Sequence, residues 1–144
     1  MIPAIVVAAA ATTGLTAAAP THDVNVSVSG MRSGKGVVRA CMTANAARFP
    51  KCAGDPASYR LVVPAADAKK LVFRNVTPGK YAIALLHDEN DNGKADRALG
   101  MMPKEGFGFS RDAPVRMAPP KYDDAVFAVG ARDVSMAIDM RYMF

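Results

Sequence analysis

Hydrophobic and polar residues alternate with a period of two along much of the chain beyond residue 21, and this pattern predicts β-strands rather than helices. The alternation is clearest at 24–29 and 134–142. The short, nearly continuous apolar run 81–87 indicates a central strand buried on both faces. No heptad, internal repeat or strand–helix alternation is present, so we expect an all-β fold, a single antiparallel β-sandwich of about seven strands with one long ordered loop. The remaining predicted strands are 37–42, 59–63, 71–76 and 124–129.

Glycine and proline residues mark the turns between these segments. Gly30 ends the first predicted strand, and Gly34 and Gly36 precede the second, so we expect these two strands to form a hairpin. The sequence Thr77-Pro78-Gly79-Lys80 places proline and glycine where a type II turn needs them, which predicts a positive φ at Gly79.

The N-terminal segment has the features of a secretory leader. Residues 1–21 carry no charged side chain, and an apolar, alanine-rich run fills 2–15. Small residues follow, which predicts a signal peptide at 1–19 with cleavage near Ala18 or Ala19. Because no Lys or Arg precedes the run, an ordinary N-terminal helix is the alternative. We expect an exported protein of the periplasm or extracellular space, whose mature domain is 20–144 and contains no membrane-spanning run of about 20 apolar residues.

Composition narrows the class of protein. A length of 144 residues fits one domain, and 51% hydrophobic with 22% charged residues is too apolar for a disordered chain. The net charge of +5 is scattered, with no run of five basic residues, so nucleic acid is not an expected partner. The expected partner is an envelope protein, a glycan or a small ligand, and the expected state is a monomer.

Cys41 and Cys52 are the only cysteines. In an exported protein such a pair is expected to form a disulfide, which on the chain-entropy model stabilises the fold by about 3 kcal/mol. A reactive thiol is the alternative, but the Cys-x-x-Cys spacing and a neighbouring histidine are both missing.

The longest segment without a periodic pattern is 88–121, and long connections of this kind are often functional. It opens with oxygen-bearing side chains at alternate positions, as a calcium loop does. An EF-hand is excluded, because a strand precedes the loop and its position 12 is Leu99 rather than a bidentate glutamate. A metal-free polar turn at Asn92-Gly93 explains the same residues, and both interpretations stay open. The expected calcium ligands are Asp88, Asn90, Asn92, Lys94 through its carbonyl, and Asp96, with Glu105 as a candidate further ligand.

Aromatic and charged residues gather near the end of the same segment. The glycines on both sides of Phe107 allow a close backbone approach, and Phe107 and Phe109 share a parity that lets them pack together. A loop fixed by two phenylalanines is one interpretation, and a contact surface is the other. That surface would consist of His87, Lys104, Glu105, Phe107, Phe109 and Ser110.

Catalysis and transport of a ligand are the competing functional interpretations. A hydrolase-like enzyme would use His87 and Glu105 for acid–base chemistry, with Ser110 as its nucleophile. No Gly-x-Ser-x-Gly, His-Glu-x-x-His or phosphate-binding glycine loop supports it, so we expect a protein without enzymatic activity. A carrier of a small apolar ligand would need an internal cavity.

Four segments together resemble a bacterial secreted family, the domain-of-unknown-function family 2141. They are VSGMRSGKG at 28–36, TPGKYA at 77–82, HDENDNGKAD at 87–96 and PKEGFGFS at 103–110, and the resemblance runs from about Val24 to Tyr142. The proline–glycine turn before a central strand is also similar to prealbumin-like and carboxypeptidase-regulatory-like sandwiches. The resemblance implies export and a prealbumin- or immunoglobulin-like β-sandwich, and it supplies no activity. We therefore expect a non-catalytic binding or structural module of the cell envelope, with calcium as its candidate cofactor.

Overall fold

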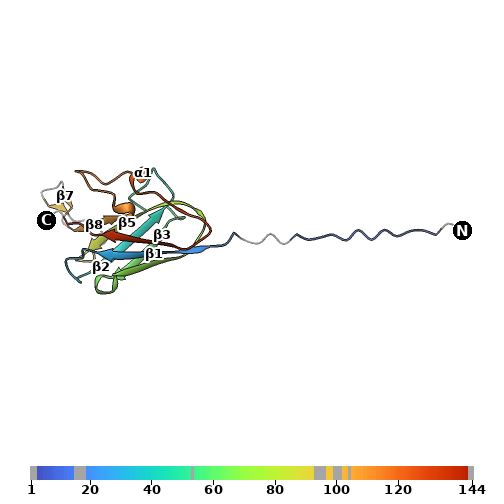
Figure 1. Ribbon diagram of the computed structural model, residues 1–144, viewed down its shortest axis with the longest axis horizontal. Helices are drawn as coiled ribbons and strands as arrows, with labels where there is room; N and C mark the ends of the chain where they lie inside the picture. The colour runs from blue at the N-terminus through green and yellow to red at the C-terminus, as the bar shows by residue number, and fades with distance from the viewer. Residues whose placement is uncertain are drawn as a thin grey trace.

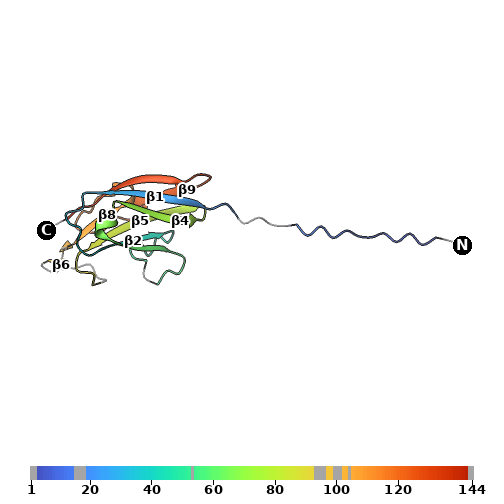
Figure 2. The same cartoon turned by 90° about the horizontal axis from the view of Figure 1, so that it is seen from below.

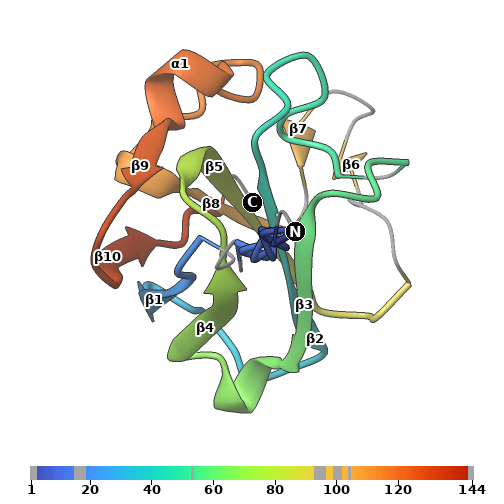
Figure 3. The ribbon, with the colours of Figure 1, turned by 90° about the vertical axis from the view of Figure 1, so that its right-hand side faces the viewer.

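Two β-sheets pack face to face in the computed structural model of the chain (Figure 1). The structure describes residues 3–14, 19–52, 54–92, 97–98, 102–103 and 105–142, with the backbone alone at 97–98 and 102–103. The first sheet contains β10 (Val134–Asp139), β1 (His22–Ser29) and β4 (Lys70–Val76), in that spatial order. The second contains β3 (Tyr59–Pro64), β2 (Val37–Thr43), β5 (Gly79–Asp88) and β8 (Gly106–Phe109), with β9 (Phe127–Val129) beside the first residues of β5. Figure 3 shows the β10–β1–β4 layer lying against the layer that contains β5, β8, β2 and β3.

Short elements fill the connections between the strands. The 3₁₀ turns η1 (Ala65–Asp67) and η2 (Ser110–Asp112) follow β3 and β8, and the single helical turn α1 (Tyr122–Ala125) precedes β9. A two-stranded pair, β6 (Arg97–Ala98) with β7 (Met102–Pro103), lies outside the main sheets. In the part of the chain that the structure describes, no helix is long and apolar enough to cross a membrane.

The described part of the predicted leader, residues 3–14, is exposed and extends away from the sandwich as a tail (Figures 1 and 2). Ala19 is also described and exposed, whereas Ala18, the other residue at the predicted cleavage site, lies outside the described residues. Cleavage therefore stays a prediction.

The core lies between the sheets, as the alternating pattern predicted. Val24, Val26 and Val28 of β1 join Val38, Ala40 and Met42 of β2 in one cluster of buried side chains. The largest side chains with almost no exposure fill the same space: Phe73, Met42, Leu71, Ile83, Leu85 and Ile138. Burial of such side chains contributes about 1.5–3 kcal/mol each, which makes this cluster the main source of stability.

A second, smaller apolar cluster lies on the outer face of the five-stranded sheet. Ala82 and Ala84 of β5 contact side chains from two connections, and Phe49 packs edge-on against Phe109 at a ring-centroid distance of 6.0 Å. The disulfide between Cys41 and Cys52, expected from the sequence, ties the first of these connections to β2. The buried members of the cluster are Phe49, Ala82, Ala84, Phe109, Ala113 and Ala125.

The all-β sandwich is confirmed, but the predicted pairing of its strands needs two corrections. The predicted hairpin of 24–29 with 37–42 is wrong, because β1 pairs with β4 and β10 whereas β2 pairs with β3 and β5. Each strand has one apolar face, and the structure places those faces on opposite sides of a shared core. The first and last strands, β1 and β10, are parallel, so the sandwich is not antiparallel throughout.

Three predicted local features also differ from the structure. Gly79 has no positive φ, because it already belongs to β5, where it is the register partner of Val129. The first half of the predicted strand 124–129 is the helical turn α1, and the segment 88–121 contains the strand β8, which pairs with β5. The last predicted strand ends at Asp139, and Arg141 bridges to Phe107 instead.

Candidate functional site

Three of the four segments noted in the sequence meet at one end of the sandwich, opposite the N-terminal tail (Figure 1). Pairing of β2 with β5 sets Val37 beside Asp88, and pairing of β5 with β8 sets His87 beside Gly106. The chain then returns at its C-terminal end, where Arg141 and Phe107 exchange two backbone hydrogen bonds of 2.8 and 2.9 Å. We call this region the motif end and define it as the described residues 30–36, 87–92, 105–107 and 141–142.

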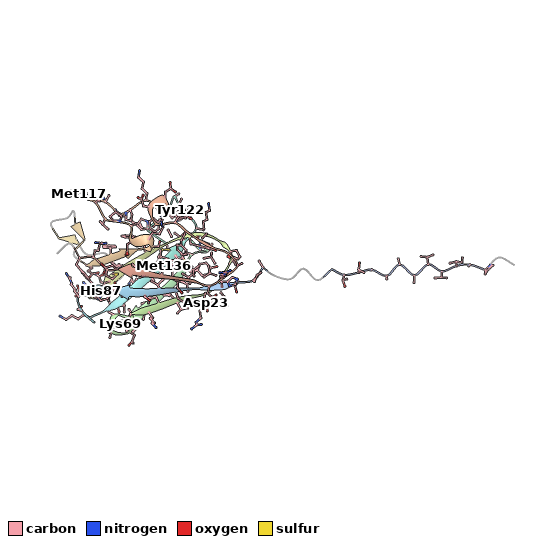
Figure 4. All side chains as sticks on the ribbon, viewed as in Figure 1. Asp23, Lys69, His87, Met117, Tyr122 and Met136 are labelled. Carbon is pink, nitrogen blue, oxygen red and sulfur yellow. A yellow bond between two sulfur atoms is a disulfide. The ribbon has the colours of Figure 1, made fainter. Side chains whose placement is uncertain are left out.

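His87 lies at the centre of the motif end and is fully buried (Figure 4). Its Nε2 atom is 2.8 Å from the carbonyl oxygen of Lys35, which can only accept, so Nε2 carries a proton and donates it. Its Nδ1 atom is 2.6 Å from the hydroxyl oxygen of Tyr142. Both ring nitrogens are therefore bonded to atoms of the scaffold, and His87 links the 30–36 loop to the C-terminal residues.

Tyr142 connects His87 to the exposed side of the motif end. Its hydroxyl accepts a hydrogen bond of 3.3 Å from the backbone N–H of Arg32, and the Arg32 guanidinium lies 4.5 Å above the centre of its ring. Burial raises the pKa of Tyr142, and the Arg32 N–H opposes part of that rise. The phenol therefore stays protonated at neutral pH and serves as a hydrogen-bonding link.

Glu89 holds the 30–36 loop from the other side. Arg32 donates from Nε to Oε1 at 2.8 Å and again from its terminal nitrogen, while the Ser33 hydroxyl donates to Oε2 at 2.9 Å. The hydrogen bonds from Arg32, with smaller contributions from Ser33 and from the charge of Arg32, lower the pKa of Glu89. The charged form of this carboxylate is thus the one that the fold stabilises.

The lowered pKa of Glu89 predicts a specific pH dependence of stability. The folded-state pKa lies below that of the unfolded chain, so the stabilisation is complete above the unfolded-state pKa and is lost as the pH falls through the folded-state pKa. Comparison of urea unfolding for the natural chain and Glu89→Gln should give a difference of about 1 kcal/mol at pH 7 that decreases as the solution is acidified through the folded-state pKa. Asp67→Asn, an exposed site, is the control and should show no such difference. A constant difference across this range would contradict the assignment.

Asp88, the first predicted calcium ligand, is fully buried and already has a cationic partner. Arg39 of β2 donates from Nε to its Oδ2 at 2.9 Å and from a terminal nitrogen to Asp91 at 2.6 Å. The other Asp88 oxygen accepts the backbone N–H of Asn92 at 3.2 Å. The pairing with Asp88 raises the pKa of Arg39. The Arg39 guanidinium therefore lies beside the carboxylates of both Asp88 and Asp91.

The structure describes only some of the remaining predicted calcium ligands. Asn90 and Asn92 are exposed, and Lys94 and Asp96 lie outside the described residues. Glu105 is buried, 3% exposed, at the start of β8. Among the residues that the structure describes, no three His, Cys, Asp or Glu side chains are placed to hold a metal ion.

Most of the described members of the predicted contact surface are buried. Phe107 and Phe109 do stack, with their ring planes 5° apart, but Phe109 is 3% exposed and packs within the second cluster. Lys104 lies outside the described residues. His87, Glu105 and Ser110 are buried as well, and among the described members Phe107 is the half-buried one.

Ser110 has a structural task at the edge of β5. Its hydroxyl accepts the Ile83 N–H at 2.9 Å and donates to the Ala125 carbonyl at 2.5 Å, which fills the gap between β8 and β9. The Ser110 hydroxyl is bonded to Ile83, which lies four positions before His87 on β5. At about 3.3 Å per residue, this spacing separates Ile83 from His87 by about 13 Å along the strand. Ser110 and His87 therefore do not form a nucleophile–base pair.

Sequence reasoning missed the three residues that organise the motif end: Arg32, Arg39 and Tyr142. Arg39 alternates with buried Val38 and Ala40, and this pattern predicts an outward-facing side chain but not the residue that it contacts. Tyr142 ends the last alternating segment, but its contact with His87 spans 55 residues. Only the tertiary fold brings these side chains to the acidic residues after β5.

Comparison with known proteins identifies one match. A family model described as an uncharacterised protein conserved in bacteria, DUF2141, matches residues 26–137, which include both sheets and most of the motif end. Neither the curated proteins nor the solved structures give a significant match.

Proposed function

The chain belongs to DUF2141, a bacterial family of uncharacterised proteins, and from this premise we propose that it is an exported, non-catalytic binding module of the cell envelope. The binding surface is the motif end, and its buried network keeps the surrounding loops in one conformation. The observation that carries the proposal is the state of His87, which is fully buried with both ring nitrogens held by scaffold atoms.

The same observation argues against the enzymatic alternative. A general base needs a lone pair within reach of a substrate proton, and the accepting nitrogen of His87 faces the Tyr142 hydroxyl instead. Glu105, the other member of that alternative, is buried at the start of β8. The carrier alternative is also weakened, because large apolar side chains occupy the space between the sheets.

Binding is supported by exposed residues whose backbone is held in place by the hydrogen bonds of the motif end. Lys35 is exposed while its carbonyl accepts from His87, and Arg141 is exposed while its backbone pairs with Phe107. A loop that is already ordered loses little entropy on binding, so affinity is gained without new contacts. Export is supported by the leader pattern and by the Cys41–Cys52 disulfide, which persists in an oxidising compartment.

Reversal of charge at the motif end tests the proposal. We expect the exported protein to begin at Ala19 or Pro20 and to co-sediment with isolated envelopes of the bacterium that makes it. Lys35→Glu combined with Arg141→Glu should reduce that association about tenfold, the effect of losing about 1.4 kcal/mol of binding energy. The control is Lys80→Glu, an equally exposed residue at the far end of β5. Retention of an uncleaved chain in the cytoplasm, or equal binding by all variants, would contradict the proposal.

Calcium binding stays a prediction of the sequence, and we propose the metal-free turn in its place. The support for the turn is the pairing of Arg39 with both Asp88 and Asp91, together with the Asn92 N–H bonded to Asp88. These bonds satisfy the loop from within the protein.

A further inference from the structure

A groove lies over the outer face of the five-stranded sheet. It has a volume of about 620 Å³ and is formed by the connection between η2 and α1. In Figure 4 this region is marked by Met117 and Tyr122 on one side of the sandwich, while His87 lies near the end. The groove residues used in the following argument are Arg111, Arg116, Lys121, Asp123, Asp124 and the prolines 114, 119 and 120.

The base of the groove is fixed to the sheet. Ala113 and Ala125 are buried in the second apolar cluster, and the Tyr122 hydroxyl donates to the Lys80 carbonyl of β5 at 2.9 Å. The Asp112 carboxylate accepts the Asp139 N–H of β10 at 2.9 Å, which holds Arg111 and Asp112 in left-handed backbone conformations with φ of 60° and 48°. Conformations of this kind cost about 1–3 kcal/mol each and persist only where the surroundings impose them.

Three cationic side chains line the groove: Arg111, Arg116 and Lys121. All three are exposed, and within the described residues none of them forms an ion pair with a carboxylate. Arg32, Arg39 and Arg74, by contrast, each pair with an acidic residue. These three cationic side chains thus lie along one concave surface.

The two acidic residues of the groove, Asp123 and Asp124, offset only part of this charge. Asp124 accepts the backbone N–H of Lys121 at 3.2 Å and so belongs to the start of α1. Asp123 is the second carboxylate, so the groove has three cationic against two anionic side chains. The prolines at 114, 119 and 120 fix the backbone φ of the groove walls, so little conformational entropy remains to be lost when an anion binds.

We propose that this groove binds the phosphate group of an anionic ligand between Arg111, Arg116 and Lys121. Arginine presents a planar set of N–H donors that matches phosphate oxygens in pairs, and lysine adds a point charge. A phosphate dianion has enough oxygens to accept from all three side chains, whereas a carboxylate has two. The source of the phosphate is either a small soluble molecule or a lipid headgroup.

Titration of the purified chain with inorganic phosphate, followed by ¹⁵N chemical-shift changes, tests the site directly. We expect saturable shifts at residues 111–124. Arg111→Gln and Arg116→Gln should each weaken binding about tenfold, as expected for the loss of one charge-assisted hydrogen bond. Asp123→Asn should tighten binding several-fold, because it removes the opposing carboxylate. Arg74→Gln, an exposed arginine of β4, removes the same charge elsewhere and should leave binding unchanged.

Two vesicle compositions distinguish the sources of the phosphate. If the ligand is a headgroup, phosphatidylglycerol vesicles compete with inorganic phosphate in the groove, and Arg116→Gln reduces vesicle binding whereas Arg74→Gln does not. If the ligand is soluble, phosphate binds and these vesicles bind no better than phosphatidylcholine vesicles. Absence of saturable shifts together with no preference for anionic vesicles would overturn the proposal. An equal loss in Arg74→Gln and Arg116→Gln would also overturn it, because that result indicates general attraction to a cationic surface.

Discussion

A Gly36→Ala chain is expected to lose most of its stability, about 3–5 kcal/mol, from strain in the backbone and overpacking together. Gly36 has φ of +67°, which side chains with a Cβ atom adopt only under strain. A Cβ atom at this position would lie 2.5 Å from the carbonyl oxygen of Glu89 and closer still to that of Asp88. Both are backbone atoms, so neither can rotate away. Chemical denaturation monitored by circular dichroism measures the loss.

Gly130→Ala is the matched control for this prediction. Nothing lies within 4 Å of a Cβ atom built on Gly130, and its φ is not positive. That variant should unfold within about 0.5 kcal/mol of the natural chain, as surface substitutions usually do. If Gly36→Ala were equally stable, the close approach of the 30–36 loop to the end of β5 would be wrong, and with it the geometry of the motif end.

Replacement of Arg39 by methionine is expected to destabilise the protein by about 2–3 kcal/mol at pH 7, because it leaves the buried carboxylate of Asp88 without its cation. The estimate lies below the values typical of fully buried pairs, since the Arg39 side chain is 33% exposed. Asp88→Asn in the Arg39→Met chain removes the uncompensated charge and should recover part of the loss. A double-mutant cycle built on these substitutions gives the coupling energy directly. Additive effects of the two substitutions would contradict the pairing.

Thermal unfolding of the natural chain, measured in millimolar calcium and again in chelator, decides between the metal-free turn and the calcium loop. For the natural chain we expect the same melting temperature in both. A calcium-specific rise of several degrees, the effect of binding at about ten times the dissociation constant, would restore the calcium interpretation.

Local pattern was sufficient to place the main strands, and it failed where tertiary contacts decide. The valines of β1 and the apolar run of β5 carry their own periodicity, so both were predictable. Strand β8 was not, because two of its four residues, Gly106 and Gly108, replace the apolar side chains that would reveal an alternation. They are glycines because Tyr142 and Ile138 pass directly over them, leaving no room for a Cβ atom.

The candidate site shows the same division between local and distant information. The sequence indicated that the residues after β5 form a polar loop, and Asp88 and Asn92 do bond to one another. Arg39, the residue that neutralises Asp88, lies 49 positions earlier and belongs to a different strand. No spacing rule within the loop distinguishes a loop that awaits a metal ion from one that already holds a guanidinium.

The parallel pairing of β1 with β10 constrains the order in which the molecule can be made. Val24 lies beside Val134, so one edge of the first strand has no partner until the residues of β10 have been synthesised. Contacts that span so much of the chain form slowly, because the entropy of closing the intervening loop is lost first. Truncation before residue 134 would therefore leave one edge of β1 unpaired and prone to aggregation.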